Sequence, residues 1–130
     1  MLRSSVDMST ESRKSILVVE DDAATRDAVA LVLQDEGYSV TGVANGKEAL
    51  HHLRQTPAPN LIVLDLMMPV MNGWEFRKQQ AKEPALKSIP VMIVSADAGV
   101  PQKAAAMGAV DYLTKPIDLD KLLEAVQRCC

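Results

Sequence analysis

Short apolar runs alternate with helix-like patterns along most of this chain, and this alternation limits the possible folds more than any other feature. Each run is four to six residues long, which suits a strand and is too short for an ordinary helix. Three of the runs are apolar throughout, a pattern typical of strands buried on both faces of a sheet. The expected strands are 16–19, 38–43, 61–64, 91–94 and 110–114.

The interval between the first two runs predicts an amphipathic helix. Its apolar residues recur at helical spacing, and Gly37 suits its C-terminal end. The expected inner face consists of Ala24, Ala28, Leu31 and Val32.

Four further helices are expected, in ranges that begin at 45, at 72 (to 83), at 100 (to 107) and near 118. Asn45 can cap the second helix with its side chain, and Pro84 prevents the third from continuing. Trp74 and Phe76, at the start of the third helix, are expected to pack against the sheet edge or the neighbouring loop. The fourth helix is short and rich in alanine, so it has little apolar bulk to hold it in place.

Strict alternation of strands and helices requires right-handed crossovers and therefore a parallel sheet with helices on both faces. At 130 residues the chain can bury one substantial core but not two. The predicted fold is α/β, a doubly wound (βα)5 domain over 16–130. A flavodoxin-like arrangement of such a domain would have a five-stranded parallel sheet with strand order 2-1-3-4-5. Residues 1–15 are polar and without periodicity, and are expected to form a flexible tail.

Composition excludes several classes of function. The net charge is −3 and the basic residues are scattered, which argues against direct nucleic-acid binding. No apolar stretch approaches the roughly 18 to 20 residues needed for membrane insertion, and the polar start does not resemble a signal peptide, so a cytoplasmic location is expected. Cys129 and Cys130 are adjacent at the chain end, where neither spaced metal ligands nor a disulfide framework can be inferred.

Polar or charged residues follow four of the five expected strands. They are Glu20, Asp21 and Asp22 after the first, Asp65 after the third, Ser95 after the fourth and Lys115 after the fifth. In an open parallel sheet, ligands bind outside the carboxyl ends of the strands, where the strand order reverses. If the first and third strands are neighbours, Asp21 and Asp65 lie a few ångströms apart across that crevice.

Carboxylates at such a separation repel one another unless a cation lies between them, and an all-oxygen ligand set suits Mg²⁺. The sequence therefore predicts a divalent metal site with Asp21 and Asp65 as direct ligands. Mg²⁺ commonly shares its coordination shell with a phosphate, while Lys115 would supply a fixed positive charge and Ser95 a hydroxyl donor. These groups suit phosphoryl transfer, in which an aspartate can be the covalent nucleophile; Asp65 would then form an acyl phosphate.

Four segments together resemble the receiver domains of two-component response regulators, of the single-domain, CheY-like type. They are ILVVEDD, LIVLDLMMPVMNG, PVMIVSA and GAVDYLTKP, and the similarity extends from residue 16 to about residue 128. The resemblance implies that Asp65 is phosphorylated and that Lys115 pairs with the acyl phosphate. It also implies that Ser95 follows the phosphoryl group inward and that Tyr112 turns from an exposed to a buried rotamer.

The same resemblance implies a ligand set for Mg²⁺, with Mn²⁺ as a substitute. Asp21 and Asp65 would bind the ion directly, Glu20 through water, and Met67 through its backbone carbonyl. The Lys115–Pro116 bond is expected to be cis.

For partners, the resemblance implies a sensor histidine kinase or a histidine phosphotransfer protein as phosphodonor, docking partly on the first helix. A downstream protein target would read a shift between two conformations on the fourth helix, fifth strand and fifth helix. The chain would be a monomer or a phosphorylation-dependent dimer, and a signalling domain that catalyses only its own phosphorylation and dephosphorylation. The methionine start and polar tail favour a stand-alone receiver over a piece of a longer chain.

Three other functions are weighed against this one. Aspartate-nucleophile phosphohydrolases carry a second aspartate two residues after the nucleophile, where this chain has Met67, and they need cap elements for which there is no room. A flavin or dinucleotide carrier would need a glycine-rich or hydroxyl-rich loop after the first strand, where Glu20, Asp21 and Asp22 would repel phosphate. A pseudo-receiver usually lacks an acidic or lysine residue of the site, and each of them is present here.

Overall fold

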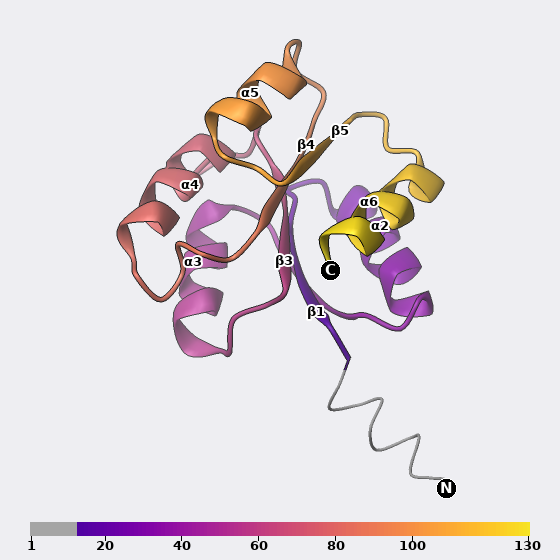
Figure 1. Ribbon diagram of the computed structural model, residues 1–130, viewed down its shortest axis with the longest axis horizontal. Helices are drawn as coiled ribbons and strands as arrows, with labels where there is room; N and C mark the ends of the chain where they lie inside the picture. The colour runs from indigo at the N-terminus through magenta and orange to yellow at the C-terminus, as the bar shows by residue number, and fades with distance from the viewer. Residues whose placement is uncertain (1–12) are drawn as a thin grey trace, which may run out of the picture.

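Five parallel strands form one sheet in the order β2-β1-β3-β4-β5, as predicted, in a computed structural model that describes residues 13–130 (Figure 1). The strands are β1 (Ser15–Val19), β2 (Ser39–Val43), β3 (Leu61–Asp65), β4 (Val91–Ser95) and β5 (Asp111–Thr114). All residues of β3 and β4 are buried, which confirms the expectation drawn from their apolar runs. Most of the expected tail lies outside the described residues, and its last residue, Ser15, is the first of β1.

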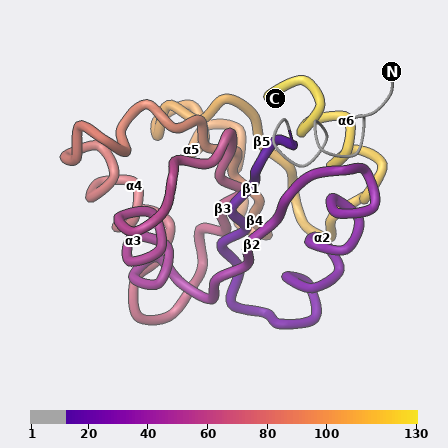
Figure 2. The backbone as a smooth tube through the Cα atoms, turned by 90° about the horizontal axis from the view of Figure 1, so that it is seen from below, coloured from indigo at the N-terminus to yellow at the C-terminus, as the bar shows by residue number. Residues whose placement is uncertain are grey.

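Helices cover both faces of this sheet. In Figures 1 and 2, α2 and α6 lie on one face, and α3, α4 and α5 lie on the other. The helices are α2 (Ala23–Asp35), α3 (Gly46–Gln55), α4 (Gly73–Lys82), α5 (Val100–Ala106) and α6 (Leu119–Cys129). Four of the five begin with an Asp or Asn side chain that accepts a backbone amide of the first turn, as Asn45 was expected to do. None of the helices in residues 13–130 is long and apolar enough to cross a membrane.

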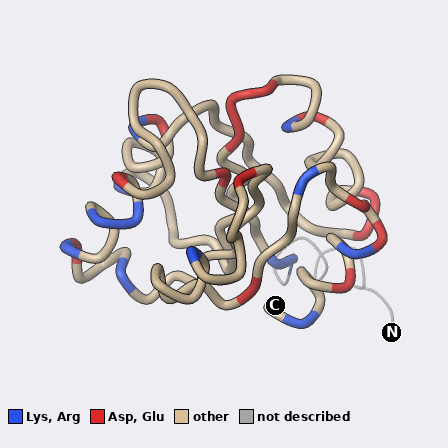
Figure 3. Tube along the Cα trace, turned by 90° about the horizontal axis from the view of Figure 1, so that it is seen from above, with Lys and Arg blue, Asp and Glu red and all other residues tan. Residues whose placement is uncertain are grey.

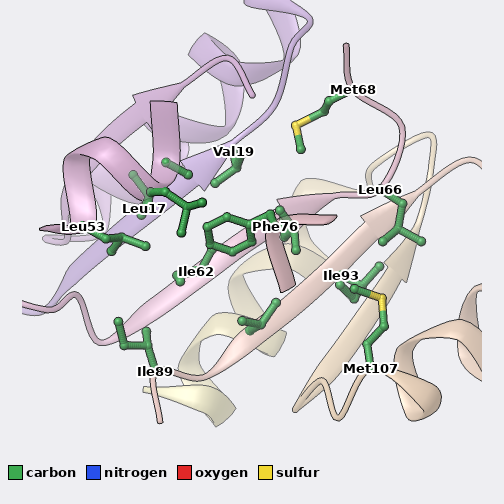
Figure 4. Packing of buried hydrophobic residues seen from close by; sticks show 14 of the residues in the cluster. Leu17, Val19, Leu53, Ile62, Leu66, Met68, Phe76, Ile89, Ile93 and Met107 are labelled. Atoms are coloured by element: carbon green, nitrogen blue, oxygen red, sulfur yellow. The ribbon is translucent and has the colours of Figure 1, made fainter. Parts of the chain in front are cut away.

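The larger apolar cluster lies between the sheet and helices α3, α4 and α5. Figure 4 shows the ring of Phe76 in its middle, close to Leu17 and Ile62 of the central strands. Phe76 is fully buried, so the expectation that it packs at the sheet edge or against a loop is wrong. Phe76 lies on the same face of α4 as the buried residues Gly73 and Gln80, and burying its whole aromatic side chain there stabilises the fold. Trp74 is only partly buried at the margin of the cluster.

The smaller cluster lies under α2 and α6, and here the predicted inner face of the first helix is wrong. Val29 and Leu33 of α2 face the sheet, whereas Ala24, Ala28 and Leu31 are exposed and Val32 is half-buried. Apolar residues occupy most of the circumference of α2, so periodicity alone permits either face. Val29 and Leu33 place two large apolar side chains one turn apart on the buried face, whereas alanine occupies two of the four positions of the predicted face.

Two glycines bring the starts of α3 and α4 close to the loop after β3. The amide of Gly46 donates to Met71 O at 2.9 Å, and the amide of Gly73 donates to Leu66 O at 3.0 Å. A Cβ at Gly73 would lie 2.5 Å from Asp65 O, so only glycine allows this approach. Val70, in the loop between β3 and α4, has a φ of 68°, an unusual left-handed conformation for a β-branched residue. The backbone after Asp65 is therefore tightly constrained.

Candidate functional site

Three carboxylates gather at the carboxyl edge of the sheet, where β1 and β3 lie side by side. One oxygen from each of Glu20, Asp21 and Asp65 lies within 4.8 Å of the others. Val19 pairs with Leu64 in the register of β1 and β3, and this places the residues after the two strands next to each other. The expected approach of Asp21 to Asp65 is therefore confirmed. In Figure 3 the acidic run 20–22 is the long red stretch at the top of the view.

Lys115 connects two of these carboxylates. Its Nζ donates to Glu20 Oε1 at 2.6 Å and to Asp65 Oδ2 at 3.2 Å, from a position just after β5. Burial alone would lower the pKa of Lys115, but the hydrogen bonds and charges of Glu20 and Asp65 outweigh it and raise the pKa above its ordinary value. The ammonium group therefore stays charged at neutral pH, and the peptide bond to Pro116 is cis as expected.

Glu20 is fixed through its backbone as well as its side chain. Its amide donates to Val43 O at 3.0 Å, and its carbonyl accepts from Arg26 Nη1 at 2.9 Å. Its second carboxylate oxygen accepts the amide of Asp22 at 3.1 Å. The side chain of Arg26 passes over Gly42, where a Cβ would come within 3.0 Å of Arg26 Cγ. Sequence reasoning did not identify Arg26, because its partner is a backbone carbonyl that no residue pattern marks.

Asp65 lies at the end of the central strand with only 5% of its surface exposed. Its Oδ1 accepts the amide of Met67 at 3.2 Å, so the backbone after β3 turns back over the carboxylate. The side chain of Met67 points away from this turn and is 61% exposed. One oxygen of Asp65 is thus held by the chain itself and the other by Lys115.

Ser95, at the end of β4, and Tyr112, within β5, lie outside the cluster of three carboxylates. Ser95 is fully buried at the end of β4, and its Oγ accepts the amide of Asp97 at 3.2 Å. Asp97 in turn pairs with Lys103 of α5 at 3.2 Å. Tyr112 is 41% exposed on β5. Within residues 13–130, no hydrogen bond joins Ser95 or Tyr112 to the three carboxylates, so their expected roles remain predictions.

The donor set fits a hard divalent cation. Three carboxylates face one ammonium group, which leaves two negative charges uncompensated within the cluster. All of the candidate side-chain ligands are oxygens, the donors that Mg²⁺ and Mn²⁺ prefer. Glu20 already accepts a hydrogen bond on each oxygen, whereas Asp21 is exposed and accepts none within the described part of the chain. Asp65 likewise accepts a hydrogen bond on each oxygen, from Met67 and from Lys115, so Asp21 is the least hydrogen-bonded carboxylate of the cluster within residues 13–130.

Among the curated proteins similar to this chain are one from Leptolyngbya boryana and one from Synechococcus elongatus. An uncharacterized 14.6 kDa protein in the sodA1 3' region of Leptolyngbya boryana is 40% identical over 125 residues, which cover 95% of each chain. The alkaline phosphatase synthesis transcriptional regulatory protein SphR of Synechococcus elongatus is also 40% identical, over 88% of this chain and 46% of its own length. The chain thus spans about half the length of this second relative.

Solved structures agree with the fold. The chemotaxis response regulator CheY4 of Vibrio cholerae is 32% identical, with a TM-score of 0.82 over 91% of this chain and 99% of that chain. The receiver domain of the sensor histidine kinase PA1611 from Pseudomonas aeruginosa is 26% identical, with a TM-score of 0.80 over 89% and 96% of the two chains. That structure contains a magnesium ion coordinated in its active site cleft.

The family model for the response regulator receiver domain matches residues 16–127, almost the whole of the described chain. The sheet order, the acidic cluster and the lysine after β5 agree with this match. The chain therefore belongs to the receiver domains of two-component response regulators.

Proposed function

We propose that Asp65 accepts a phosphoryl group from a phosphohistidine, on a sensor histidine kinase or a histidine phosphotransfer protein, in a reaction that depends on Mg²⁺. The observation that carries this proposal is the placement of Asp65, a nearly buried carboxylate 3.2 Å from Lys115 Nζ and within 4.8 Å of two further carboxylates. A carboxylate oxygen would attack the phosphorus and form an acyl phosphate, while the histidine leaves.

The charges of the site support this chemistry. Phosphoryl transfer depends mostly on positioning and on neutralising the charge of the phosphoryl oxygens. Lys115 supplies a fixed positive charge for this task, and Ser95 is proposed to donate its hydroxyl to the phosphoryl group. A bound Mg²⁺ or Mn²⁺ would add charge neutralisation. Asp21 and Asp65 are its proposed direct ligands, together with the Met67 carbonyl, and Glu20 would act through water.

The proposed output is a shift between two conformations. When Ser95 turns to the phosphoryl group, its Oγ would move away from the Asp97 amide, from which it accepts a hydrogen bond at 3.2 Å. The loop between β4 and α5 would then rearrange, and Tyr112 would move from its exposed position. A downstream protein would read the change on the surface of α5, β5 and α6. We propose 16–130 as the receiver unit, acting as a monomer or a phosphorylation-dependent dimer in the cytoplasm.

The exposed side of α2 is the proposed docking face for the phosphodonor. Ala24 and Ala28 line a concavity of about 330 Å³ that also includes Lys115, Pro116 and Ile117. Leu31, on the same exposed side of α2, is 59% exposed. A mostly apolar surface that reaches Lys115 would bring the phosphohistidine of a bound partner near Asp65.

The test is the intact mass of the chain after incubation with acetyl phosphate and Mg²⁺. Wild type should gain one phosphoryl group, and Asp65→Asn should gain none. Asp27→Asn, which changes an exposed aspartate on α2, should behave as wild type. Chelation of the metal should abolish the mass gain, and Mn²⁺ should restore it.

Phosphorylation of Asp65→Asn to the same extent would show that another residue is the acceptor. If no phosphorylated species forms, even with a donor kinase or phosphotransfer protein, the chain signals without phosphate, through protein contacts alone.

A further inference from the structure

A second concave surface lies between α4 and α5, on the face of the sheet opposite α2. This groove has a volume of about 330 Å³. Its lining includes the aromatic ring of Trp74, the thioether of Met107 and three basic side chains, Arg77, Lys78 and Lys87. It therefore combines apolar contact area with positive charge, in a chain whose net charge is −3.

Arg77 carries a fixed positive charge without an acidic partner. Its guanidinium donates to the carbonyl oxygens of Met107 and Gly108, at 2.9 and 3.3 Å, and to Gln80 Oε1 at 2.7 Å. All three acceptors are neutral, and none of the ion pairs formed within residues 13–130 includes Arg77. Partial burial lowers the pKa of Arg77, as expected for a cation that lacks a counter-charge. Such a group favours an anion at the groove.

The two lysines of the groove are also uncompensated. Lys78 and Lys87 are exposed and take part in none of the ion pairs of the described residues. The carboxylates close to them in sequence have other partners. Glu75 accepts the amide of Asn72 at 3.0 Å, and Glu83 pairs with Arg54 at 2.6 Å. In Figure 3, several basic segments lie on the left side of the molecule, the side on which Figure 1 places α3, α4 and α5.

We propose that this groove binds an acidic segment of a partner protein, with an apolar side chain of that segment packed beside Trp74. Carboxylates of the segment would meet Arg77, Lys78 and Lys87, and the apolar side chain would cover Trp74 and Met107. A long polyanion such as a nucleic acid fits less well, because the acidic remainder of the chain repels it beyond the groove. The inference is separate from phosphorylation, since no groove residue belongs to the acidic cluster.

The test begins with a library of short random peptides displayed on phage and selected against the immobilised full chain. Selected peptides should be rich in Asp and Glu, with at least one large apolar residue. Trp74 is the only tryptophan of the sequence, so synthetic copies of these peptides should change its fluorescence on binding. The double variant Lys78→Glu with Lys87→Glu should weaken their binding about tenfold or more.

The matched control is Lys47→Glu with Lys121→Glu, which reverses two exposed lysines on α3 and α6 and changes the net charge equally. It should leave binding within about twofold of wild type, allowing for long-range charge effects. Thermal melting by circular dichroism checks that both double variants fold.

Three results would overturn the inference. One is a selection that yields no acidic peptides, and another is equal loss of affinity in both double variants. The third is a single-stranded oligonucleotide that binds as tightly as the peptides and displaces them, since it would assign the groove to nucleic acid.

Discussion

Helices α2 and α3 lie on opposite faces of the sheet and are held there in different ways. The inner face of α3 is easy to recognise, because its buried residues Ala49, Leu50 and Leu53 recur at helical spacing between polar ones. In α2, apolar residues lie on both sides, and only Val29 and Leu33 are buried. When a helix has more apolar residues than the core can bury, the remaining ones stay exposed and are available to a partner protein.

The sharpest test of this contrast compares two leucines of α2. Leu33 is fully buried, and Leu31, two residues before it, is 59% exposed. Leu33→Ala should lower the free energy of unfolding by about 2 to 5 kcal/mol, because it leaves a cavity under the helix. Leu31→Ala should change it by less than about 0.5 kcal/mol. Urea unfolding measures both, and a larger loss for Leu31→Ala than for Leu33→Ala would mean that α2 packs with the face first predicted.

The start of α3 gives the next largest effect. A Cβ at Gly46 would lie 2.8 Å from Met71 Cγ and 2.9 Å from Phe76 Cβ. Gly46→Ala should therefore cost about 1 to 3 kcal/mol, despite the better helix propensity of alanine. At the equivalent first position of α2 the chain already has an exposed alanine, Ala23, and Ala23→Gly should cost about 1 kcal/mol at most. If Gly46→Ala were as stable as wild type, the loop after β3 would have to shift to make room for the added methyl group.

The cap of α3 should contribute less. Asn45 Oδ1 accepts the amide of Glu48 at 2.9 Å, and Asn45→Ala should cost about 1 kcal/mol. Asn45→Asp keeps the acceptor and should stay close to wild type. Thermal unfolding of wild type and the two variants measures these differences in stability. If Asn45→Ala were as stable as wild type, the tertiary contacts of Gly46 alone would fix the start of the helix.

The smallest effect concerns the ion pair between Arg54 of α3 and Glu83 after α4, for which α2 has no counterpart among the described ion pairs. Hydrogen bonding to Arg54 lowers the pKa of Glu83 below its ordinary value of 4.5. The pair therefore stabilises the fold above that value, and its contribution is lost as the pH falls through the lowered pKa. The stability difference between wild type and Glu83→Gln should be small at neutral pH and should vanish in acid. A difference that persists in acid would point to packing instead.

Much of this molecule follows from local patterns in the sequence. Apolar runs and strict alternation predicted a parallel sheet with helices on both faces, and the flavodoxin-like arrangement supplied its strand order. With that order, the strand ends predicted the meeting of Asp21 and Asp65. Strand bounds differed by one residue, as with Asp65, which the apolar pattern could not assign to β3. The contacts that no pattern marks were missed: Arg26 binds a carbonyl, and Lys115 reaches Glu20 across 95 positions of sequence.

The inner face of α2 and the position of Phe76 could not be derived for a different reason. Both depend on which of several apolar side chains fills a fixed volume under the sheet, and periodicity carries no information on volume. The left-handed Val70 is likewise a product of the closed loop after β3, since valine has no local preference for that conformation.

The central place of β3 in the sheet has a consequence for the time scale of motion. Its five residues are all buried between β1 and β4, so its amide hydrogens should exchange with solvent only when the whole domain unfolds. β5 is an edge strand with alternating exposure, and its amides should exchange through smaller openings. Asp65 therefore lies on the strand whose amides should exchange most slowly, and Lys115 follows a strand whose amides should exchange faster. The hydrogen bond between Lys115 and Asp65 can therefore break and re-form many times before β3 itself unfolds.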